Sequence, residues 1–274
     1  MATGKGSDEM KRRETGGERG AQSERPRQIG VSPEPSREFW NRAFMEVAPE
    51  VRDAPPGRDL SDIVSHLRSS SAVRVLDVGC GLGHWSVTLA RAGFHVLAVD
   101  VSFEALRIVR ERARREGLAI ATAVCAAQEL SQLEVHVDAV VCNSVLDHMR
   151  PFDAELAAGS MAHVLKPAGL AYVSFDGLDK SNAEPEVSSD YFIHSDGTWE
   201  YVAGSRRGMF WRFYDDAEVR RLFREFEEVE FIVAASGQRR AWFRKPRGVQ
   251  GSTARGRDGH FPYFGAHYRR SARS

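Results

Sequence analysis

Acidic and glycine residues follow one another between positions 73 and 102 in a pattern that suits a nucleotide-like ligand. An apolar run over 73–78 carries Asp77 and leads into glycines at 79, 81 and 83, and a second apolar run over 94–99 ends on Asp100. Glycines allow a tight turn and a close approach of ligand to main chain. An acid at the tip of the second strand accepts hydrogen bonds from ribose hydroxyls. Asp77 would repel a pyrophosphate but attract a cationic ligand.

The elements that must position these residues alternate along the chain. We predict strands over 73–78, 94–99, 118–124, 137–142 and 170–175, separated by helices over 85–92, 103–116 and 152–164. Strands that alternate with helices indicate a parallel sheet with helices on both faces. Residues 229–235 and 241–244 flank Ser236-Gly237-Gln238, which predicts a C-terminal antiparallel hairpin. The expected fold is therefore α/β, with a mostly parallel seven-stranded sheet.

Composition changes divide the chain into three parts. Residues 1–35 are rich in Gly, Ser, Arg, Glu and Pro, and residues 246–274 in Gly, Arg and Ser, so we predict a disordered N-terminal extension and a disordered basic tail. Residues 36–245 form the predicted domain, which begins with an amphipathic helix over 37–47. Within it, 177–213 breaks the alternation and predicts an inserted hairpin that could form a lid over the substrate.

The 274 residues carry no net charge, but the charges are unevenly placed. Residues 28–238 hold 21 basic and 32 acidic side chains, whereas 239–274 hold ten basic and one acidic. The acidic body argues against a broad nucleic-acid footprint, while the basic tail leaves such docking open. Three cysteines without metal or redox spacing fit a reduced, cytoplasmic protein. We expect no membrane span and no secretory segment.

Four sequence blocks give the chain a family resemblance over about residues 70–245. They are 76–83 (Leu-Asp-Val-Gly-Cys-Gly-Leu-Gly), 99–106 (Val-Asp-Val-Ser-Phe-Glu-Ala-Leu), 137–148 (Val-Asp-Ala-Val-Val-Cys-Asn-Ser-Val-Leu-Asp-His) and 165–169 (Leu-Lys-Pro-Ala-Gly). In this order and spacing they resemble the class I S-adenosylmethionine-dependent methyltransferases, whose fold is Rossmann-like. A dinucleotide fits less well, because Gly83 comes one residue early for Gly-x-Gly-x-x-Gly and His84 takes the expected place.

The resemblance implies which residues hold S-adenosylmethionine. Asp77 and the loop that follows would surround the methionine part, Asp100 would bind the ribose and Val101 would pack on the adenine. The family usually has an acid after the strand 118–124, but Ala126 stands there, so Gln128, Glu129 or a backbone group would have to compensate. Asn143 would lie beside the donor methyl. The full predicted set is Asp77, Gly79, Cys80, Gly81, Gly83, Asp100, Val101, Ala127, Gln128 and Asn143.

The acceptor side is harder to predict. Transfer of a methyl group from a sulfonium needs an aligned nucleophile, and a base only where that nucleophile is protonated. His148 and Asp147 are the catalytic candidates, although the family often has a histidine at this position as a structural feature, which is the commoner explanation. Candidate substrate contacts are Trp40, Tyr191, His194 and Arg212; packing, a surface position or a solvated charge would explain the same residues. No metal is required by this chemistry, and no metal-ligand cluster is evident in the sequence.

The leading hypothesis is O- or N-methylation of a small molecule by a monomer or homodimer. One alternative is an RNA or protein methyltransferase that docks through the basic tail. Against methylation of exocyclic amines of bases, residues 142–145 read Cys-Asn-Ser-Val rather than an Asn/Asp-Pro-Pro-Tyr signature. The other alternative is a module that binds the cofactor without catalysis, and the Ala126 departure is consistent with it.

Overall fold

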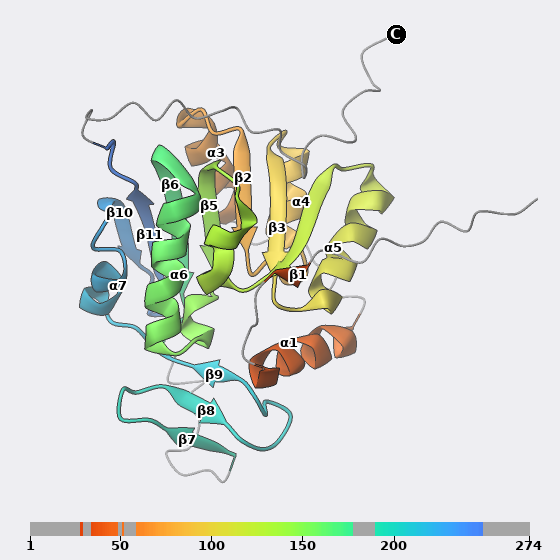
Figure 1. Cartoon of the computed structure of the whole chain (residues 1–274), viewed down its shortest axis with the longest axis vertical. Coiled ribbons are helices and arrows are strands. Elements are labelled where there is room, and N and C mark those ends of the chain that lie inside the picture. The colour runs from red at the N-terminus through yellow and green to blue at the C-terminus, as the bar shows by residue number, and fades with distance from the viewer. Residues whose placement is uncertain (1–27, 30–33, 49–50, 52–58, 178–189, 249–274) are drawn as a thin grey trace, which may run out of the picture.

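The computed structural model describes residues 28–29, 34–48, 51, 59–177 and 190–248. One twisted sheet with helices on both faces forms most of it (Figure 1). The strands of this sheet are β1 (Gln28–Ile29), β2 (Arg74–Val78), β3 (His95–Asp100), β4 (Ile120–Cys125), β5 (Val137–Asn143), β6 (Leu165–Phe175), β10 (Glu227–Val233) and β11 (Arg239–Arg244). The helices are α1 (Glu34–Glu46), α3 (Asp59–Ser69), α4 (His84–Arg91), α5 (Phe103–Glu116), η1 (Ala127–Leu133), η2 (Leu146–His148), α6 (Pro151–Val164) and α7 (Asp216–Leu222).

The predicted seven-stranded, mostly parallel sheet is confirmed. Its strand order is β4-β3-β2-β5-β6-β11-β10, and the two-residue strand β1 extends it beyond β4. All pairs from β1 to β6 are parallel, and β11 pairs antiparallel with both β6 and β10. From β2 the chain adds β3 and β4 in one direction, and from β5 it adds β6 in the other. The strand order therefore reverses between β2 and β5. Ligands of such sheets bind at the carboxyl ends of the strands beside this reversal.

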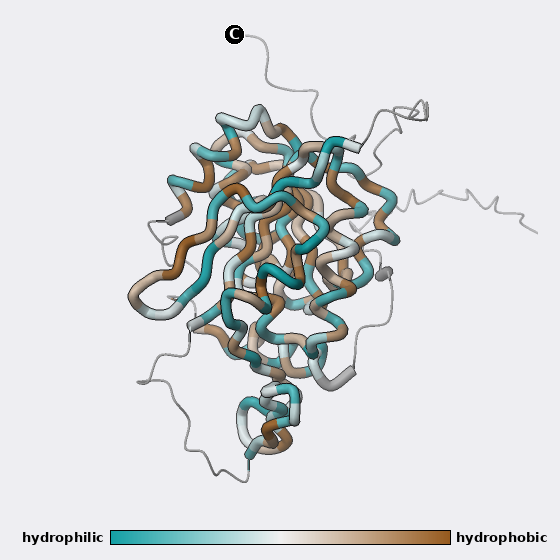
Figure 2. Tube along the Cα trace, turned by 90° about the vertical axis from the view of Figure 1, so that its left-hand side faces the viewer, coloured by the Kyte–Doolittle hydropathy of each residue, from teal (hydrophilic) through white to brown (hydrophobic). Residues whose placement is uncertain are grey.

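Alternate residues of the strands face two separate hydrophobic layers. Val75, Val96 and Val141 pack with apolar residues of α3 and α4. Their neighbours Leu76, Leu97 and others pack with α6, α7 and η1. Figure 2 shows the hydrophobic colours gathered along these inner strands. Burial on both faces explains why the parallel strands read as nearly continuous apolar runs.

A second, smaller sheet lies beyond one end of the main sheet, next to α6 and α1 (Figure 1). It consists of β7 (Tyr191–Ile193), β8 (Trp199–Tyr201) and β9 (Phe210–Trp211) in an antiparallel arrangement. The antiparallel pair β7–β8 is a hairpin within the predicted insertion 177–213, and the lid role of that insertion stays a prediction. Phe39 of α1 packs into the cluster formed by Tyr191, Tyr201 and Met209. The first helix and the inserted sheet thus share one hydrophobic core.

Some boundaries differ from the prediction. The segment after β4, expected to be a linker, forms the 3-10 helix η1, because Leu130 and Leu133 bury themselves against the core. Strand β1 and the start of α1 fall inside the predicted N-terminal extension, so regular structure begins before residue 36. Residues 1–27, 178–189 and 249–274 lie outside the described residues, and the disorder predicted for both ends stays a prediction. No helix of the described chain is long and apolar enough to cross a membrane.

Candidate cofactor and acceptor site

The glycine loop between β2 and α4 has a backbone that other residues would strain. Gly79, Gly81 and Gly83 have positive φ angles of 65°, 48° and 74°. A Cβ atom at Gly79 would overlap the side chain of Val145, and one at Gly83 would lie 2.7 Å from Cγ2 of Val109. The loop is therefore closely packed on its protein side, and its glycines are required by both the turn and the neighbouring side chains.

Asp77 supports this loop from beneath. Its carboxylate is buried and accepts a hydrogen bond of 2.5 Å from Oγ of Ser86 in α4. Burial raises the pKa of Asp77 to about 7, and the nearby charge of Asp100 adds to the rise, whereas the Ser86 hydrogen bond opposes it. Asp77 is not among the residues that line the cavity described below, so its charge acts on that cavity through the loop.

Asp100 lies at the carboxyl end of β3 with both carboxylate oxygens engaged. Oδ2 accepts from the N–H of Gly81 at 2.9 Å, and Oδ1 accepts from the N–H of Ser102 at 2.8 Å. Burial raises the pKa of Asp100 to about 6, which these backbone N–H groups partly counteract. The carboxylate therefore ties the glycine loop to the start of α5 and still borders the cavity.

A cavity opens over the carboxyl ends of β2, β3, β4 and β5. Seven of the predicted site residues line it: Trp40, Gly79, Asp100, Val101, Ala127, Gln128 and His148. The other lining residues are Ser36, Phe44, Cys125, Ser144, Val145, Met149, Arg150, Asp153 and Phe210. Gly79, Asp100 and Val101 lie on one side of the strand-order reversal, and His148, Met149 and Phe210 on the other.

Several predicted cofactor residues do not reach the cavity themselves. Cys80, Gly81 and Gly83 belong to its supporting loop, with Cys80 N–H donating to the Val99 carbonyl at 3.0 Å. Asn143 accepts a hydrogen bond from Oγ of Ser174 at 2.8 Å, and its neighbours Ser144 and Val145 line the cavity. The carboxyl end of β5 therefore lies at the cavity, as predicted. The residues that line the cavity there are Ser144 and Val145, one and two positions after the predicted Asn143.

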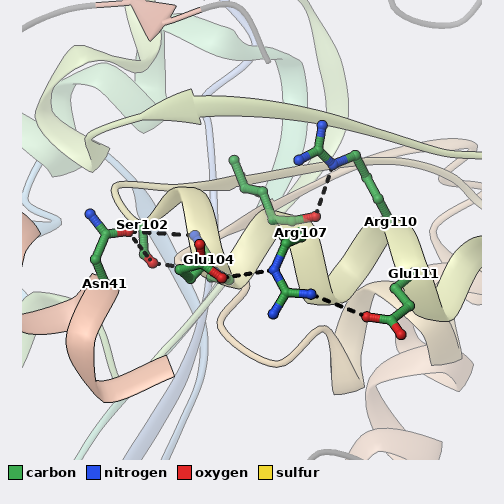
Figure 3. A network of polar contacts seen from close by, with 8 residues as sticks. Asn41, Ser102, Glu104, Arg107, Arg110 and Glu111 are labelled. Atoms are coloured by element: carbon green, nitrogen blue, oxygen red, sulfur yellow. Dashed lines mark hydrogen bonds and ion pairs between the residues drawn. The ribbon is translucent and has the colours of Figure 1, made fainter. Parts of the chain in front are cut away.

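Helix α1 covers the cavity with two aromatic rings, Trp40 and Phe44, whose centroids lie 5.7 Å apart. Asn41, which lies between these two residues in the sequence, forms hydrogen bonds that hold the helix to the start of α5 (Figure 3). Oδ1 of Asn41 accepts from Oγ of Ser102 at 2.8 Å and from the N–H of Glu104 at 3.4 Å. Ser102, the N-cap of α5, therefore connects α1 with Asp100.

His148 lies at the acceptor end of the cavity in a defined orientation. Its Nδ1 is 3.0 Å from the carbonyl oxygen of Phe210. A carbonyl only accepts, so Nδ1 carries the proton and Nε2 of the neutral ring keeps a free lone pair. The ring packs edge-on against Trp40, with centroids 5.1 Å apart. Strand β9 and α1 together therefore fix this imidazole.

The other predicted acceptor residues lie away from the cavity. Tyr191 is buried in the core that α1 shares with the small sheet. His194 pairs with Glu200 at 2.8 Å. Arg212 is buried and pairs with Glu218 at 2.5 Å. None of the three lines the cavity, and Phe210, Met149 and Arg150, which were not predicted, do.

Asp147 and His148 are joined by a third group that the sequence prediction missed, Asp176. Each of the three offers a ligand atom, and these atoms all lie within 4.8 Å of one another. Asp176 directly follows β6, the parallel neighbour of β5, and its Oδ1 accepts from Oγ of Ser144 at 2.8 Å. Its position after a strand adjacent to β5 was the available signal. These three side chains could together hold one cation.

Comparison with known sequences finds relatives for the central part of the chain. Residues 75–169 match a family model described as a methyltransferase domain. A ubiquinone biosynthesis O-methyltransferase of Xylella fastidiosa (strain M23) is 36% identical over 114 residues, which are 41% of this chain and 46% of that protein. The corresponding enzyme of Hahella chejuensis is 31% identical over 134 residues, covering 48% and 56%. The chain thus spans about half the length of the curated relatives it matches.

Solved structures agree on the fold. A 1,6-didemethyltoxoflavin-N1-methyltransferase of Burkholderia thailandensis superposes with a TM-score of 0.58 at 19% identity, over 81% of this chain and 94% of that one. An S-adenosylmethionine-dependent methyltransferase of Clostridium acetobutylicum gives 0.57 at 14% identity, over 75% and 98%. These likenesses show the fold. Residues 75–169 of this chain match a methyltransferase domain, and the chain has the fold of class I S-adenosylmethionine-dependent methyltransferases.

Proposed function

We propose that this protein transfers a methyl group from S-adenosylmethionine to an oxygen or nitrogen atom of a small molecule. The observation that carries the proposal is the single cavity that runs from Gly79 and Asp100 to Trp40, His148 and Phe210. A donor site and an acceptor site that share one cavity allow in-line transfer. The enclosing rings of α1 and β9 suit a compact acceptor better than a polymer.

The residues present fit the cofactor in the family's orientation. Asp100 would accept hydrogen bonds from the ribose hydroxyls, with Val101 and Ala127 against the adenine. The negative charge of Asp77 favours a cationic amino-acid end at the loop. When bound, the cofactor supplies an electrophilic methyl on a sulfonium.

Gln128 is the candidate for the adenine-reading role that Ala126 leaves open. Its Oε1 is buried and has no hydrogen-bond partner among the described residues, although the side chain lines the cavity. Such an atom loses its hydration without compensation, which costs roughly 1–3 kcal/mol. An adenine amino group would satisfy it. We therefore propose that Gln128 takes the place of the acid that the family usually has nearby.

Gln128→Leu should reduce the discrimination between adenine and hypoxanthine. Wild type should bind S-adenosylhomocysteine about 3- to 10-fold more tightly than S-inosylhomocysteine, as one hydrogen bond of about 1 kcal/mol predicts. Calorimetry of both ligands on both proteins measures this. If Gln128→Leu keeps the wild-type preference, Gln128 does not read the amino group.

The chain's own residues have three tasks in the reaction. The glycine loop and Asp100 fix the donor, and positioning of this kind is worth up to about 7–11 kcal/mol in intramolecular reactions. Trp40 and Phe44 exclude water from above. Where the accepting atom is protonated, its proton must be taken by a base or displaced by a cation. We propose that Asp147 and His148 provide that function, since His148 borders the cavity and the Phe210 carbonyl holds its Nδ1.

Cofactor affinity should rise with pH between about 5.5 and 7.5. The carboxyl pKa values of Asp77 and Asp100 are raised to about 7 and about 6 in the free protein, and their ionised forms bind the cofactor better. The same raised pKa values mean that these groups stabilise the free fold at low pH, and that this contribution is lost as pH rises through 6 and 7.

Calorimetry of S-adenosylhomocysteine across this pH range should show affinity increasing about tenfold or more, with proton release on binding. Repeating one pH in buffers of different ionisation enthalpy counts the protons. Flat affinity without proton release would contradict the proposed environment of both carboxylates.

The function itself is tested by a screen with methyl-labelled donor against a metabolite extract, RNA and protein in parallel. Label should appear in the metabolite fraction. Label confined to RNA or protein, and lost when residues 249–274 are deleted, would contradict the proposal and favour docking through the basic tail. Cofactor binding with no labelled product in any fraction would favour a non-catalytic module. The cytoplasmic location and the monomeric or homodimeric state remain predictions.

A further inference from the structure

Helix α3 and the edge strand β10 flank a groove that is separate from the cofactor cavity. At its base the buried ring of Trp242 in β11 packs edge-on against Tyr172 of β6, with centroids 5.1 Å apart. His66 of α3 stacks on the same Trp242 ring at 4.2 Å. The groove is lined by Asp62, Ile63, His66, Tyr172, Glu230, Ile232, Arg240 and Trp242. None of these eight residues lines the cofactor cavity.

The β10 wall of this groove exposes apolar surface. The register sets Glu230 opposite Trp242 and Ile232 opposite Arg240, so these side chains share the groove face of the sheet. Ile232 is 44% exposed there. On the other face of β10, Phe231 packs against the core. The groove face of the strand therefore offers an apolar side chain and an aromatic base to a further segment.

Carboxylates at this edge of the sheet favour a basic partner. Asp62 and Glu230 are both exposed at the groove, whereas Arg240 is the one lysine or arginine among its lining residues. Glu227 and Glu228 precede Glu230 on the same strand. A second copy paired through β10 would place glutamates opposite glutamates, which is unfavourable. A segment rich in arginine would instead be attracted.

The C-terminal segment of this chain has the matching chemistry. Residues 261–268 read Phe-Pro-Tyr-Phe-Gly-Ala-His-Tyr. Within 249–274 one acid, Asp258, stands against five arginines, at positions 255, 257, 269, 270 and 273 on the two sides of this aromatic run. Aromatic rings bury large apolar areas and pack on other rings, and arginine pairs well with carboxylates. A segment with an aromatic centre and basic flanks thus fits a groove with an aromatic base and an acidic rim.

The chain leaves β11 close to this groove. The N–H of Lys245 donates to the carbonyl of Gly169 at 2.9 Å, which holds the chain beside β6 three residues after Trp242. Residues 249–260 span up to about 40 Å when extended, so 261–268 can reach the groove. Such a tether keeps the segment at an effective concentration on the order of millimolar. Individually weak contacts are therefore enough for docking.

We propose that residues 261–268 dock into this groove of their own chain. Their aromatic side chains pack over Ile232 and Trp242, and the flanking arginines lie beside Asp62 and Glu230. The inference departs from our prediction that the whole of 246–274 is disordered, and it holds whatever the methyl acceptor is. It assigns the basic tail an intramolecular partner in place of a nucleic acid.

A spin label on the segment tests this in the full-length chain. The three native cysteines are buried, so a thiol-specific nitroxide reagent labels the cysteine of Ala266→Cys. In nuclear magnetic resonance spectra the label should broaden the indole N–H signal of Trp242 and the amide signal of Ile232. The amide signals of Gly79 and Val101 in the cofactor cavity should stay sharp. Mixing isotope- and spin-labelled chains with an excess of unlabelled chains should leave the broadening unchanged, because the contact is intramolecular.

Charge reversal in the groove should release the segment. The double variant Asp62→Lys/Glu230→Lys should weaken docking about threefold or more, as the loss of two exposed ion pairs predicts. Glu155→Lys/Glu225→Lys makes the same charge change at two exposed residues outside the groove, and it should keep the broadening. Both double variants should bind S-adenosylhomocysteine as the wild type does, which shows that they are folded.

Three results would overturn the inference. The first is no broadening at Trp242 and Ile232, or broadening at Gly79 and Val101 instead. The second is equal broadening in the two double variants, which would mean that the groove carboxylates do not hold the segment. The third is broadening that disappears when unlabelled chains are added, because the occupant of the groove would then be the tail of a second copy.

Discussion

Asp100→Ala should weaken the binding of S-adenosylhomocysteine by at least about 100-fold. The change removes the carboxylate proposed to bind both ribose hydroxyls, and hydrogen bonds to a charged group contribute about 1.5–3 kcal/mol each. It also leaves the N–H groups of Gly81 and Ser102 without their acceptor, so the glycine loop loses its tie to α5. Both effects lower affinity.

Calorimetry with full-length proteins measures this loss, and two variants separate its causes. Asp100→Asn keeps one acceptor oxygen, so it can bind the N–H of Gly81 or of Ser102 but not both. It should therefore lose less stability than Asp100→Ala but still bind at least about tenfold more weakly than wild type. Asp153→Asn removes a carboxylate from the α6 side of the same cavity and should bind as wild type does. Affinity unchanged in Asp100→Ala would refute the ribose assignment.

Gly79→Ala should reduce both stability and cofactor affinity. The residue has φ of 65°, where a side chain costs roughly 1–2 kcal/mol. The new Cβ would also overlap the side chain of Val145, which lines the cavity. The free energy of unfolding should fall by about 1–3 kcal/mol, and movement of the loop or of Val145 should weaken S-adenosylhomocysteine binding at least tenfold.

Gly117→Ala is a matched control for this prediction. Gly117 has φ of 66°, and a Cβ there would meet nothing within 4 Å. It ends α5, outside the cavity, so its replacement should cost stability and leave affinity unchanged. Urea denaturation gives the free energies, and calorimetry gives the affinities. Equal losses of affinity in the two variants would mean that general destabilisation, not loop geometry, explains the result.

The geometry of the glycine loop and the position of Asp100 at a strand end were predictable because both are local. The glycines, Asp77 and Asp100 lie within one strand–helix–strand unit, in which each residue's place follows from the unit itself. At the single departure, Ala126, we propose that Gln128, two residues later, compensates. Only the partners across the sheet, such as Val145 against Gly79, required the three-dimensional structure.

The acceptor side depends on contacts between distant segments, which the sequence does not show. Tyr191 and His194 have suitable chemistry, but pairing with β8 turns Tyr191 into the core shared with α1 and leaves His194 with Glu200. Phe210, which lines the cavity, and Asp176, which contacts the lining residue Ser144, come from segments that carry no recognisable motif. Their importance follows from the Phe210 carbonyl against His148 and from the adjacency of β5 and β6.

The most direct test of the central claim is a calorimetric titration of S-adenosylhomocysteine, and separately of NAD, into the full-length wild-type chain. The cavity built on Gly79 and Asp100 predicts one S-adenosylhomocysteine site per chain and no saturable binding of NAD. Binding of NAD, or no binding of S-adenosylhomocysteine at any pH between 6 and 8, would contradict the assignment of this cavity.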